Sequence, residues 1–311
     1  MQYNRELIQK ADLQLADLAP GGLLVPKQAA RFLRIAIKRN VLTGRVRVPT
    51  MTHPEERHPK ILWTGRVMHA ASPGTALPTA QRSKPTFDRM TLVSKLGKAE
   101  VHIDREVLED QIERNVLRQT VIDFMGEKVS ADFEEALING DTTSSDDWLA
   151  LQNGLLGLTT TNVLAGGGVT LSGDVLRDLI ETMPNEFDGQ PDLRFYTNRK
   201  ARSDYRSSVR TRATALADGV IAGTTDKELG YDGVPLTYVP RFPNNLGVGT
   251  NRTNVLYCDA KNGVMGFQRK VTLDTEFRIS EQVWAIVITV RMAIQWEHEP
   301  AVAKAADIVG V

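Results

Sequence analysis

The segment "DREVLEDQIERNVLRQTVIDFMGEKVSADFEEALING", residues 104–140, is the clearest indication of the architecture. It contains no proline, and its apolar residues recur mainly at every fourth position. This spacing places them on one side of an α-helix and differs from the 3.5-residue spacing of a coiled coil. The apolar positions are Leu108, Ile112, Val116, Val121, Met125, Val129, Phe133 and Leu137. A helix over residues 104–139 would be about 54 Å long, so we predict that it runs along the whole molecule.

A second long apolar segment, residues 283–296, alternates as a strand does. At about 3.3 Å per residue this strand spans roughly 40 Å, which nearly matches the predicted helix. One of its two faces is large and apolar throughout: Trp284, Ile286, Ile288, Val290, Met292, Ile294 and Trp296. We therefore predict that the strand and the helix lie along each other.

Residues 49–103 are predicted as two long strands joined by a tip rich in Pro, Ser, Thr and Gly. The returning strand alternates at Met90 and Leu92 and resumes with the opposite parity from Ala99, so we place a β-bulge at Gly97. A ribbon of two strands is marginally stable in water and buries few of its own side chains. The ribbon is therefore predicted to need a partner surface.

The remaining segments are an arm and an α/β unit. Residues 1–50 carry nine Lys or Arg against three acidic residues, which makes the arm basic. Helices are predicted near 174–183 and 198–217, on either side of a strand at 193–197. The stretch "YDGVP" at 231–235 is typical of a turn that enters a strand.

Composition limits the classes of function. The 311 residues include 38 Lys plus Arg and 38 Asp plus Glu, so the formal net charge is zero, and any contact with nucleic acid or a membrane must be local. The single cysteine, Cys258, excludes an internal disulfide framework and a cysteine metal cluster, and we predict that it is a small buried hydrophobe. No signal peptide and no apolar run long enough to cross a bilayer is present, so we expect a soluble protein.

Patterns of catalysis and metal binding are weak. The stretch "HPEERHP" at 53–59 combines His and Glu, but its prolines prevent helical pairing of ligands. The segments "AGGGV" and "GVGTNRTN" lack the Lys-Ser/Thr pair or the helix that would hold phosphate. The paired carboxylates at 55–56 and 146–147 fall in predicted loops, where solvation is the ordinary interpretation. We expect no enzyme activity, no catalytic residue, no metal and no cofactor.

The order of the parts resembles the major capsid proteins of tailed phages (Caudoviricetes), which share the Hong Kong 97 phage fold. An arm, a long ribbon, a very long helix ending in "ALINGDT", an α/β segment and long final strands follow one another. Short stretches of sequence are similar too: "DREVLEDQIERN", "INGDTTSSDDWLALQNGLLG", "YDGVPLTYVP" and "VLYCDAKNGVMGFQRKVTLDTE". The resemblance covers nearly the whole chain.

This resemblance implies an α+β fold and a division of the chain into five parts. They are an N-terminal arm (1–48), an extended loop or β-ribbon (49–103), a peripheral domain (104–173) with a spine helix (104–139), an α/β axial domain (174–253) and return strands (254–311). The implied function is structural: a virion head protein that self-assembles into hexamers and pentamers of an icosahedral shell around double-stranded DNA. The alternatives are an encapsulin-type nanocompartment that encloses protein cargo and, more distantly, a soluble α/β enzyme.

The resemblance also implies partners. They are further copies of the chain, a scaffolding protein, a portal protein, a decoration protein in some heads, and packaged DNA contacted without sequence specificity. Because only residues 1–48 precede the ribbon and the chain begins with Met1, we expect a separately encoded scaffold and little N-terminal cleavage. Assembly is expected in the cytoplasm of a host bacterium and without a membrane. Covalent crosslinking is left open, although Lys60 and Lys84 are the lysines nearest the ribbon tip.

Ten charged side chains are candidates for contacts between subunits: Arg31, Arg34, Arg45, Arg47, Lys60, Arg66, Arg82, Lys84, Glu134 and Glu135. The two glutamates oppose the dipole at the C-terminal end of the helix, where the last turn contains no Lys or Arg. We hypothesise that a basic segment meets them in the assembled shell, either the arm at 31–47 or a neighbour's ribbon near Arg82 and Lys84. A solvated acidic face is the alternative.

Two glycines mark the predicted helix. Asn139-Gly140 ends it, and Gly140 is free to take the left-handed conformation that often follows a helix. Gly126 lies inside the helix as a weak point where a bend can form.

Overall fold

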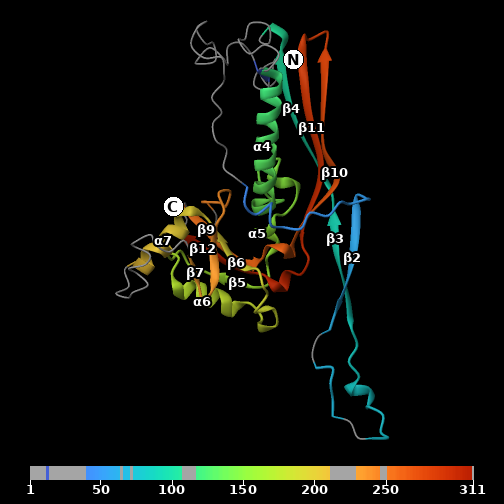
Figure 1. Cartoon of the computed structure of the whole chain (residues 1–311), viewed down its shortest axis with the longest axis vertical. Coiled ribbons are helices and arrows are strands. Elements are labelled where there is room, and N and C mark those ends of the chain that lie inside the picture. Colours follow the sequence, from blue (N-terminus) through green and yellow to red (C-terminus); the bar gives the residue numbers. More distant parts are fainter. Residues whose placement is uncertain are drawn as a thin grey trace.

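The chain folds around one long helix with a sheet along it, a ribbon that extends away from the body and an α/β unit at one end (Figure 1). The computed structural model describes residues 12–13, 40–63, 66–70, 73–106, 117–210, 229–245 and 251–309. Most of the predicted arm and the candidate residues Arg31 and Arg34 lie outside these ranges.

Four strands form the sheet that runs beside the long helix, in the order β1-β4-β11-β10. The strands are β1 (Asp12–Leu13), β4 (Lys95–Asp104), β10 (Gly263–Arg278) and β11 (Val283–Trp296). The central strand β11 pairs antiparallel with both β4 and β10, while β1 pairs parallel with β4. On the predicted apolar face of β11 all but Trp284 are buried, as the alternating pattern requires.

The spine helix α4 (Leu117–Asn139) lies along this sheet (Figure 1). Its residue Met125 is buried against Ile103 of β4 and against Ile286 and Ile288 of β11. Nearer the C-terminal end, Phe133 and Leu137 join a cluster that contains Val290, Met292 and Ile294. The prediction that the helix and the strand lie along each other is therefore confirmed.

The predicted start of the spine helix at residue 104 is wrong. Asp104 is the last residue of β4 and pairs with Val283 of β11. Helical residues begin at Arg105 and Glu106, and residues 107–116 lie outside the described ranges. The difference from the predicted boundary is one residue, because Asp104 still pairs with Val283 of β11.

The ribbon consists of β2 (Glu55–Leu62) and β3 (Thr86–Val93), which pair antiparallel from Glu55↔Val93 to Leu62↔Thr86. The returning strand was predicted as one element to residue 103, but it breaks at Ser94 and continues as β4 in the sheet. The change of parity therefore occurs at this break. Gly97 forms no bulge, since the β4–β11 register passes through it without a shift.

A second sheet of six strands forms the α/β unit, in the order β5-β12-β9-β6-β8-β7. Its strands are β5 (Val163–Ala165), β6 (Leu193–Thr197), β7 (Gly230–Tyr231), β8 (Val234–Tyr238), β9 (Arg252–Asp259) and β12 (Ala303–Val309). The strand predicted at 193–197 is thus confirmed. The predicted turn is confirmed too, because Asp232 and Gly233 have φ values of 50° and 80°, as a tight hairpin between β7 and β8 requires.

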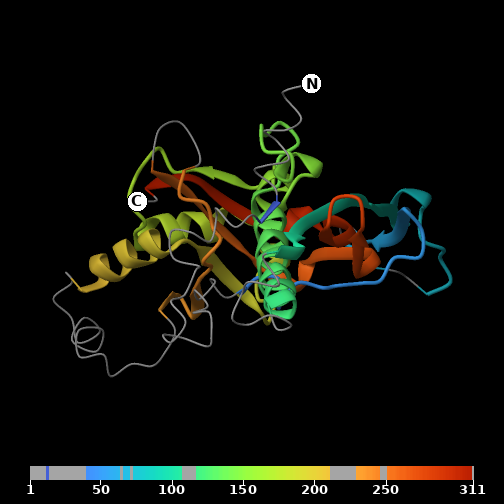
Figure 2. The same ribbon diagram turned by 90° about the horizontal axis from the view of Figure 1, so that it is seen from above.

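Helices cover both faces of the six-stranded sheet. On one face, α6 (Gly173–Thr182) and α7 (Arg199–Arg210) pack against a cluster that includes Phe195 and Tyr257. On the other face, Tyr196 packs with the C-terminal end of α4 and with α5 (Leu155–Leu158). Seen from above, α4 lies between this sheet and the β10–β11 hairpin (Figure 2). The spine helix therefore joins the two sheets into one body.

Candidate functional site: the extended ribbon and the cleft beside the spine helix

The ribbon exposes large apolar side chains far from the body of the molecule. Ile61 and Phe87 form a directly opposed pair across β2 and β3, and they are 66% and 72% exposed. Beyond the strands, Trp63 is half exposed while its indole N–H donates to Ser83 Oγ at 3.1 Å, and Met68 is almost fully exposed. Isolated exposed apolar residues are ordinary, but a group on one projecting element indicates a contact surface.

The base of the ribbon is held firmly in the body. Met90 and Leu92 of β3 are buried in a small cluster with Met51, Val264 and Ala293. At the break between β3 and β4, the hydroxyl of Ser94 donates to Gln268 Oε1 at 2.8 Å. The apolar distal part of the ribbon is thus presented on an anchored support.

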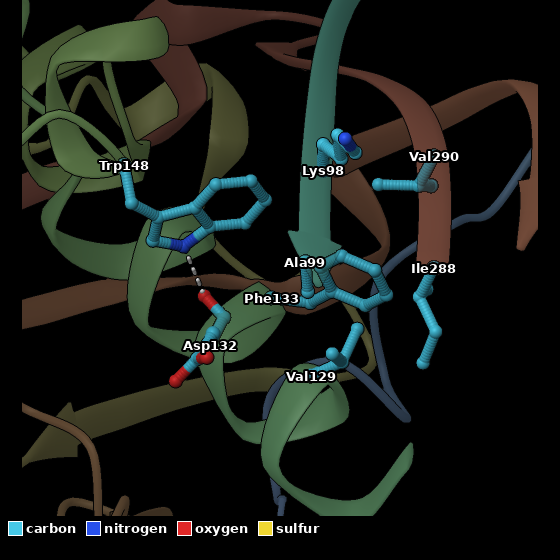
Figure 3. A pocket seen from close by; sticks show the side chains of 8 residues that line it. All are labelled: Lys98, Ala99, Val129, Asp132, Phe133, Trp148, Ile288 and Val290. Carbon is cyan, nitrogen blue, oxygen red and sulfur yellow. Dashed lines mark hydrogen bonds between the residues drawn. The ribbon is translucent and has the colours of Figure 1, made fainter. Parts of the chain in front are cut away.

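An apolar cleft lies between the spine helix and the four-stranded sheet, with a volume of about 170 Å³. Figure 3 shows Phe133 of α4 and Trp148 of the following loop on two sides of the cleft. Their ring centroids are 6.0 Å apart. The other walls are Val129 and Asp132 of α4, Lys98 and Ala99 of β4, and Ile288 and Val290 of β11.

The position of Trp148 depends on two contacts. Its indole N–H donates to the backbone oxygen of Asp132 at 2.9 Å, which ties the loop to the last turns of α4 (Figure 3). Its ring also lies over Gly97, where a Cβ atom would come within 2.4 Å of the indole. Gly97 is therefore required for the close approach of Trp148.

Charge is distributed unevenly between the ribbon and the region around the cleft. Residues 57–87 contain five Lys or Arg and no acidic residue. Residues 129–153, which begin in α4 and include Trp148, contain six acidic residues and no Lys or Arg, while Lys98 of β4 is a basic residue in the cleft wall. In a chain of zero net charge, these two segments are complementary to each other.

Glu134 holds residues 40–46, here called the arm root, against the spine helix. Its side chain is 0% exposed, and its Oε1 accepts hydrogen bonds from the backbone N–H groups of Val41 and Leu42, both at 2.6 Å. One turn earlier on α4, Ser130 accepts from the side-chain amide of Asn40 at 2.8 Å through its backbone oxygen. A buried carboxylate is tolerated when hydrogen bonds stabilise it.

Comparison with known proteins agrees with this architecture. The model of the phage capsid family matches residues 21–306. This chain belongs to the phage capsid family. It is 30% identical over 310 residues to the putative prophage capsid protein YqbE of Bacillus subtilis strain 168, and the match covers 98% of this chain and 99% of that protein. The chain is thus a structural major capsid protein, located in the shell of the virion.

Solved structures support the α+β capsid fold. The capsid of a native GTA particle has a TM-score of 0.65 at 18% identity, and the match covers 96% of this chain and 100% of that chain. The encapsulin SrpI of Synechococcus elongatus PCC 7942 has a TM-score of 0.59 at 14% identity, with coverage of 96% and 98%. These likenesses show the fold alone, and the family model and the 30% identical relative distinguish the phage capsid from the encapsulin alternative.

Several predicted contact residues of this capsid chain have partners within the subunit. Arg47 forms an ion pair with Glu297, and Lys60 approaches Asp88 across the ribbon at 3.9 Å. Arg45 lies near enough to Asp192 to contribute to its lowered pKa, which is due first to a hydrogen bond from Lys261. Arg66, Arg82 and Lys84 are exposed on the ribbon, where Arg82 donates to the backbone oxygen of Leu77.

Two predictions at the C-terminal end of the spine helix are wrong. The arm meets Glu134, as one of the two hypotheses has it, but within the same subunit and through the backbone N–H groups of Val41 and Leu42 instead of basic side chains, and Glu134 is buried there. Gly140 does not adopt a positive φ. It is required for space, since a Cβ there would lie 2.3 Å from the backbone oxygen of Gln152. Glu135 is half-buried and remains a candidate contact.

Other titratable groups have ordinary structural roles. Cys258 is buried as predicted, and burial raises the pKa of its thiol. Glu56 of the "HPEERHP" stretch accepts a hydrogen bond from the backbone N–H of Thr52, which is the main cause of its lowered pKa. Within the described ranges, no group of three or more His, Cys, Asp or Glu could hold a metal ion. No helix in the same ranges is long and apolar enough to span a membrane.

Replacing Glu134 with alanine should destabilise the subunit by about 2–4 kcal/mol, because two backbone donors lose their acceptor inside the protein. Denaturant unfolding of the purified chain measures this change. The matched control is Glu135→Ala, which removes a half-buried acid from the same turn and should change stability by less than about 0.5 kcal/mol. Equal unfolding midpoints for the two variants would show that the contact with the arm root contributes little.

Proposed function

We propose that this chain forms the hexamers and pentamers of an icosahedral phage head, and that the ribbon of each subunit lies on a neighbouring subunit. The observation that carries the proposal is the opposed pair Ile61 and Phe87, both largely exposed on an element that projects from the body. Burying one such side chain contributes about 1.5–3 kcal/mol. If a neighbouring subunit buries the pair, each contact in the shell is stabilised by this amount.

The neighbour's surface that suits the ribbon best is the region around the cleft of Phe133 and Trp148. This region is lined mainly by apolar side chains, and residues 129–153 carry acidic side chains without Lys or Arg, opposite in charge to residues 57–87 of the ribbon. Exposed Arg66 and Lys84, for which the described residues provide no ion-pair partner, would lie near Glu135 or the acidic loop that follows it. Such a contact weakens as salt screens it.

The further partners follow from the same proposal. The head encloses double-stranded DNA, and a portal protein and, in some heads, a decoration protein join the shell. A separately encoded scaffolding protein guides assembly in the bacterial cytoplasm.

Electron microscopy of the purified chain, with and without the candidate scaffolding protein, tests the proposal. We expect closed icosahedral shells of uniform size when the scaffold is present. Discrete soluble oligomers under the same conditions would contradict it. Shells that are isolated from cells and contain protein cargo but no nucleic acid would contradict the enclosure of DNA and favour the encapsulin alternative.

A further inference from the structure

Helix α7 presents four arginines along one side: Arg199, Arg202, Arg206 and Arg210. At 3.6 residues per turn their directions fall within an arc of about 80°, and the series spans about 16 Å along the axis. Arg202 is half-buried and the other three are exposed. The helix lies at the end of the α/β unit remote from the spine helix (Figure 1). The four guanidinium groups therefore form a continuous positive stripe.

This stripe is not neutralised by the described part of the subunit. None of the four arginines has a carboxylate within ion-pair distance among the described residues, whereas Lys200 on another side of α7 pairs with Asp204 at 2.7 Å. On the neighbouring helix, Arg177 is surrounded by three acidic side chains: Asp174, Asp178 and Glu181. Within the described ranges, the stripe thus carries positive charge that no carboxylate neutralises.

The chemistry of the stripe favours phosphate over a protein surface. Its side chains are all guanidinium groups, which are hydrogen-bond donors only, and guanidinium forks match phosphate oxygens in pairs. A protein interface needs apolar or aromatic anchors at its centre, and no large hydrophobic side chain of α7 is exposed. The absence of an exposed aromatic ring on α7 also disfavours stacking on single-stranded bases.

We propose that the arginine stripe of α7 binds the phosphate backbone of double-stranded DNA without reading its sequence. The inference rests on the proposed function, because a head that encloses DNA brings a high density of phosphate to the subunit. Duplex DNA carries one negative charge per about 1.7 Å of its axis. The stripe can therefore contact successive phosphates at any position along the duplex.

The test is binding of the purified full-length chain to a fluorescent 30-base-pair duplex of random sequence, measured by anisotropy from low to moderate salt. The variant Arg199→Gln/Arg206→Gln/Arg210→Gln should bind at least about tenfold more weakly at low salt. The plot of log affinity against log salt concentration should also be shallower by about 0.9 for each phosphate that the variant no longer neutralises. Replacement of the same residues with lysine should retain most of the slope.

Arg177→Gln is the matched control, because this arginine lies on the adjacent helix but is already paired. Its binding should equal that of the unchanged chain, and thermal unfolding should show that all variants remain folded. Binding by the glutamine variant with unchanged affinity and slope would overturn the proposal. If the glutamine variant binds DNA normally but does not assemble into shells, the stripe is a contact between subunits, and the proposal is again overturned. Assembly is scored separately by microscopy, so failure of the unchanged chain to form shells would affect only the proposed function.

Discussion

Replacing Ile61 and Phe87 with serine should abolish shell formation while leaving the isolated subunit folded. The two side chains are largely exposed in the subunit, so their removal takes little from its own core. If each is buried by a neighbour, the interface is weakened by about 3 kcal/mol or more, which corresponds to roughly a hundredfold weaker association. Sedimentation and electron microscopy of the purified variant measure the result.

The matched control for this experiment is Ile61→Leu/Phe87→Leu, which keeps most of the apolar area of the ribbon. It should form shells at nearly the concentration that the unchanged chain requires. Normal assembly of the serine variant would show that the ribbon does not contribute the main contact. Failure of both variants to assemble would point to shape complementarity at this pair as the requirement, in place of apolar area.

Replacing Gly140 with alanine should destabilise the subunit by about 3 kcal/mol or more, because overpacking here can be relieved only by moving the backbone. The added methyl group would approach backbone oxygens of Gln152 and Ala136 at 2.3 and 2.8 Å. The clash lies where the loop that leads into α5 crosses the end of the spine helix, and the backbone N–H of Gly154 donates to the backbone oxygen of Gly140 there at 2.7 Å. Calorimetric unfolding of the purified chain measures the destabilisation.

Gly126→Ala is the opposite case in the same helix. Nothing lies within 4 Å of the added Cβ, and alanine favours the helical conformation over glycine by about 1 kcal/mol. This variant should therefore unfold at a higher temperature than the unchanged chain. A similar destabilisation in both variants would show that the crossing at Gly140 is looser than the structure describes.

The parts of the fold that repeat locally could be predicted from the sequence. The fourfold spacing from Val121 to Leu137 and the alternation from Trp284 to Trp296 each repeat over many residues, so the side that faces the core is evident in both. Strand β6 and the turn at Asp232-Gly233 are similarly local. The contact between α4 and β11 could be predicted because two long apolar faces of similar length bury each other away from water.

The details at the end of the spine helix could not be predicted, because their causes lie far away in the chain. Glu134 looked like a surface acid, and its burial depends on backbone groups of Val41 and Leu42, more than ninety residues earlier. The position of Gly140 suggested a helix cap. Its actual role is to leave space for the backbone oxygen of Gln152, which lies where a side chain would be. The need for glycine at position 97 could not be predicted either, because it comes from the ring of Trp148, which lies close to Gly97.

Helix α4 makes different contacts before and after Gly126. After Gly126, the helix is fastened on several sides: to the arm root through Glu134, to the loop through Trp148, and to the crossing loop at Gly140. Before Gly126, its core contacts are made with the four-stranded sheet. The helix is therefore held less firmly before Gly126 than after it, and Gly126 itself is an exposed residue of low helix propensity. If subunits occupy positions of different curvature in one shell, we expect α4 to bend at Gly126, with the residues after Gly126 keeping their contacts.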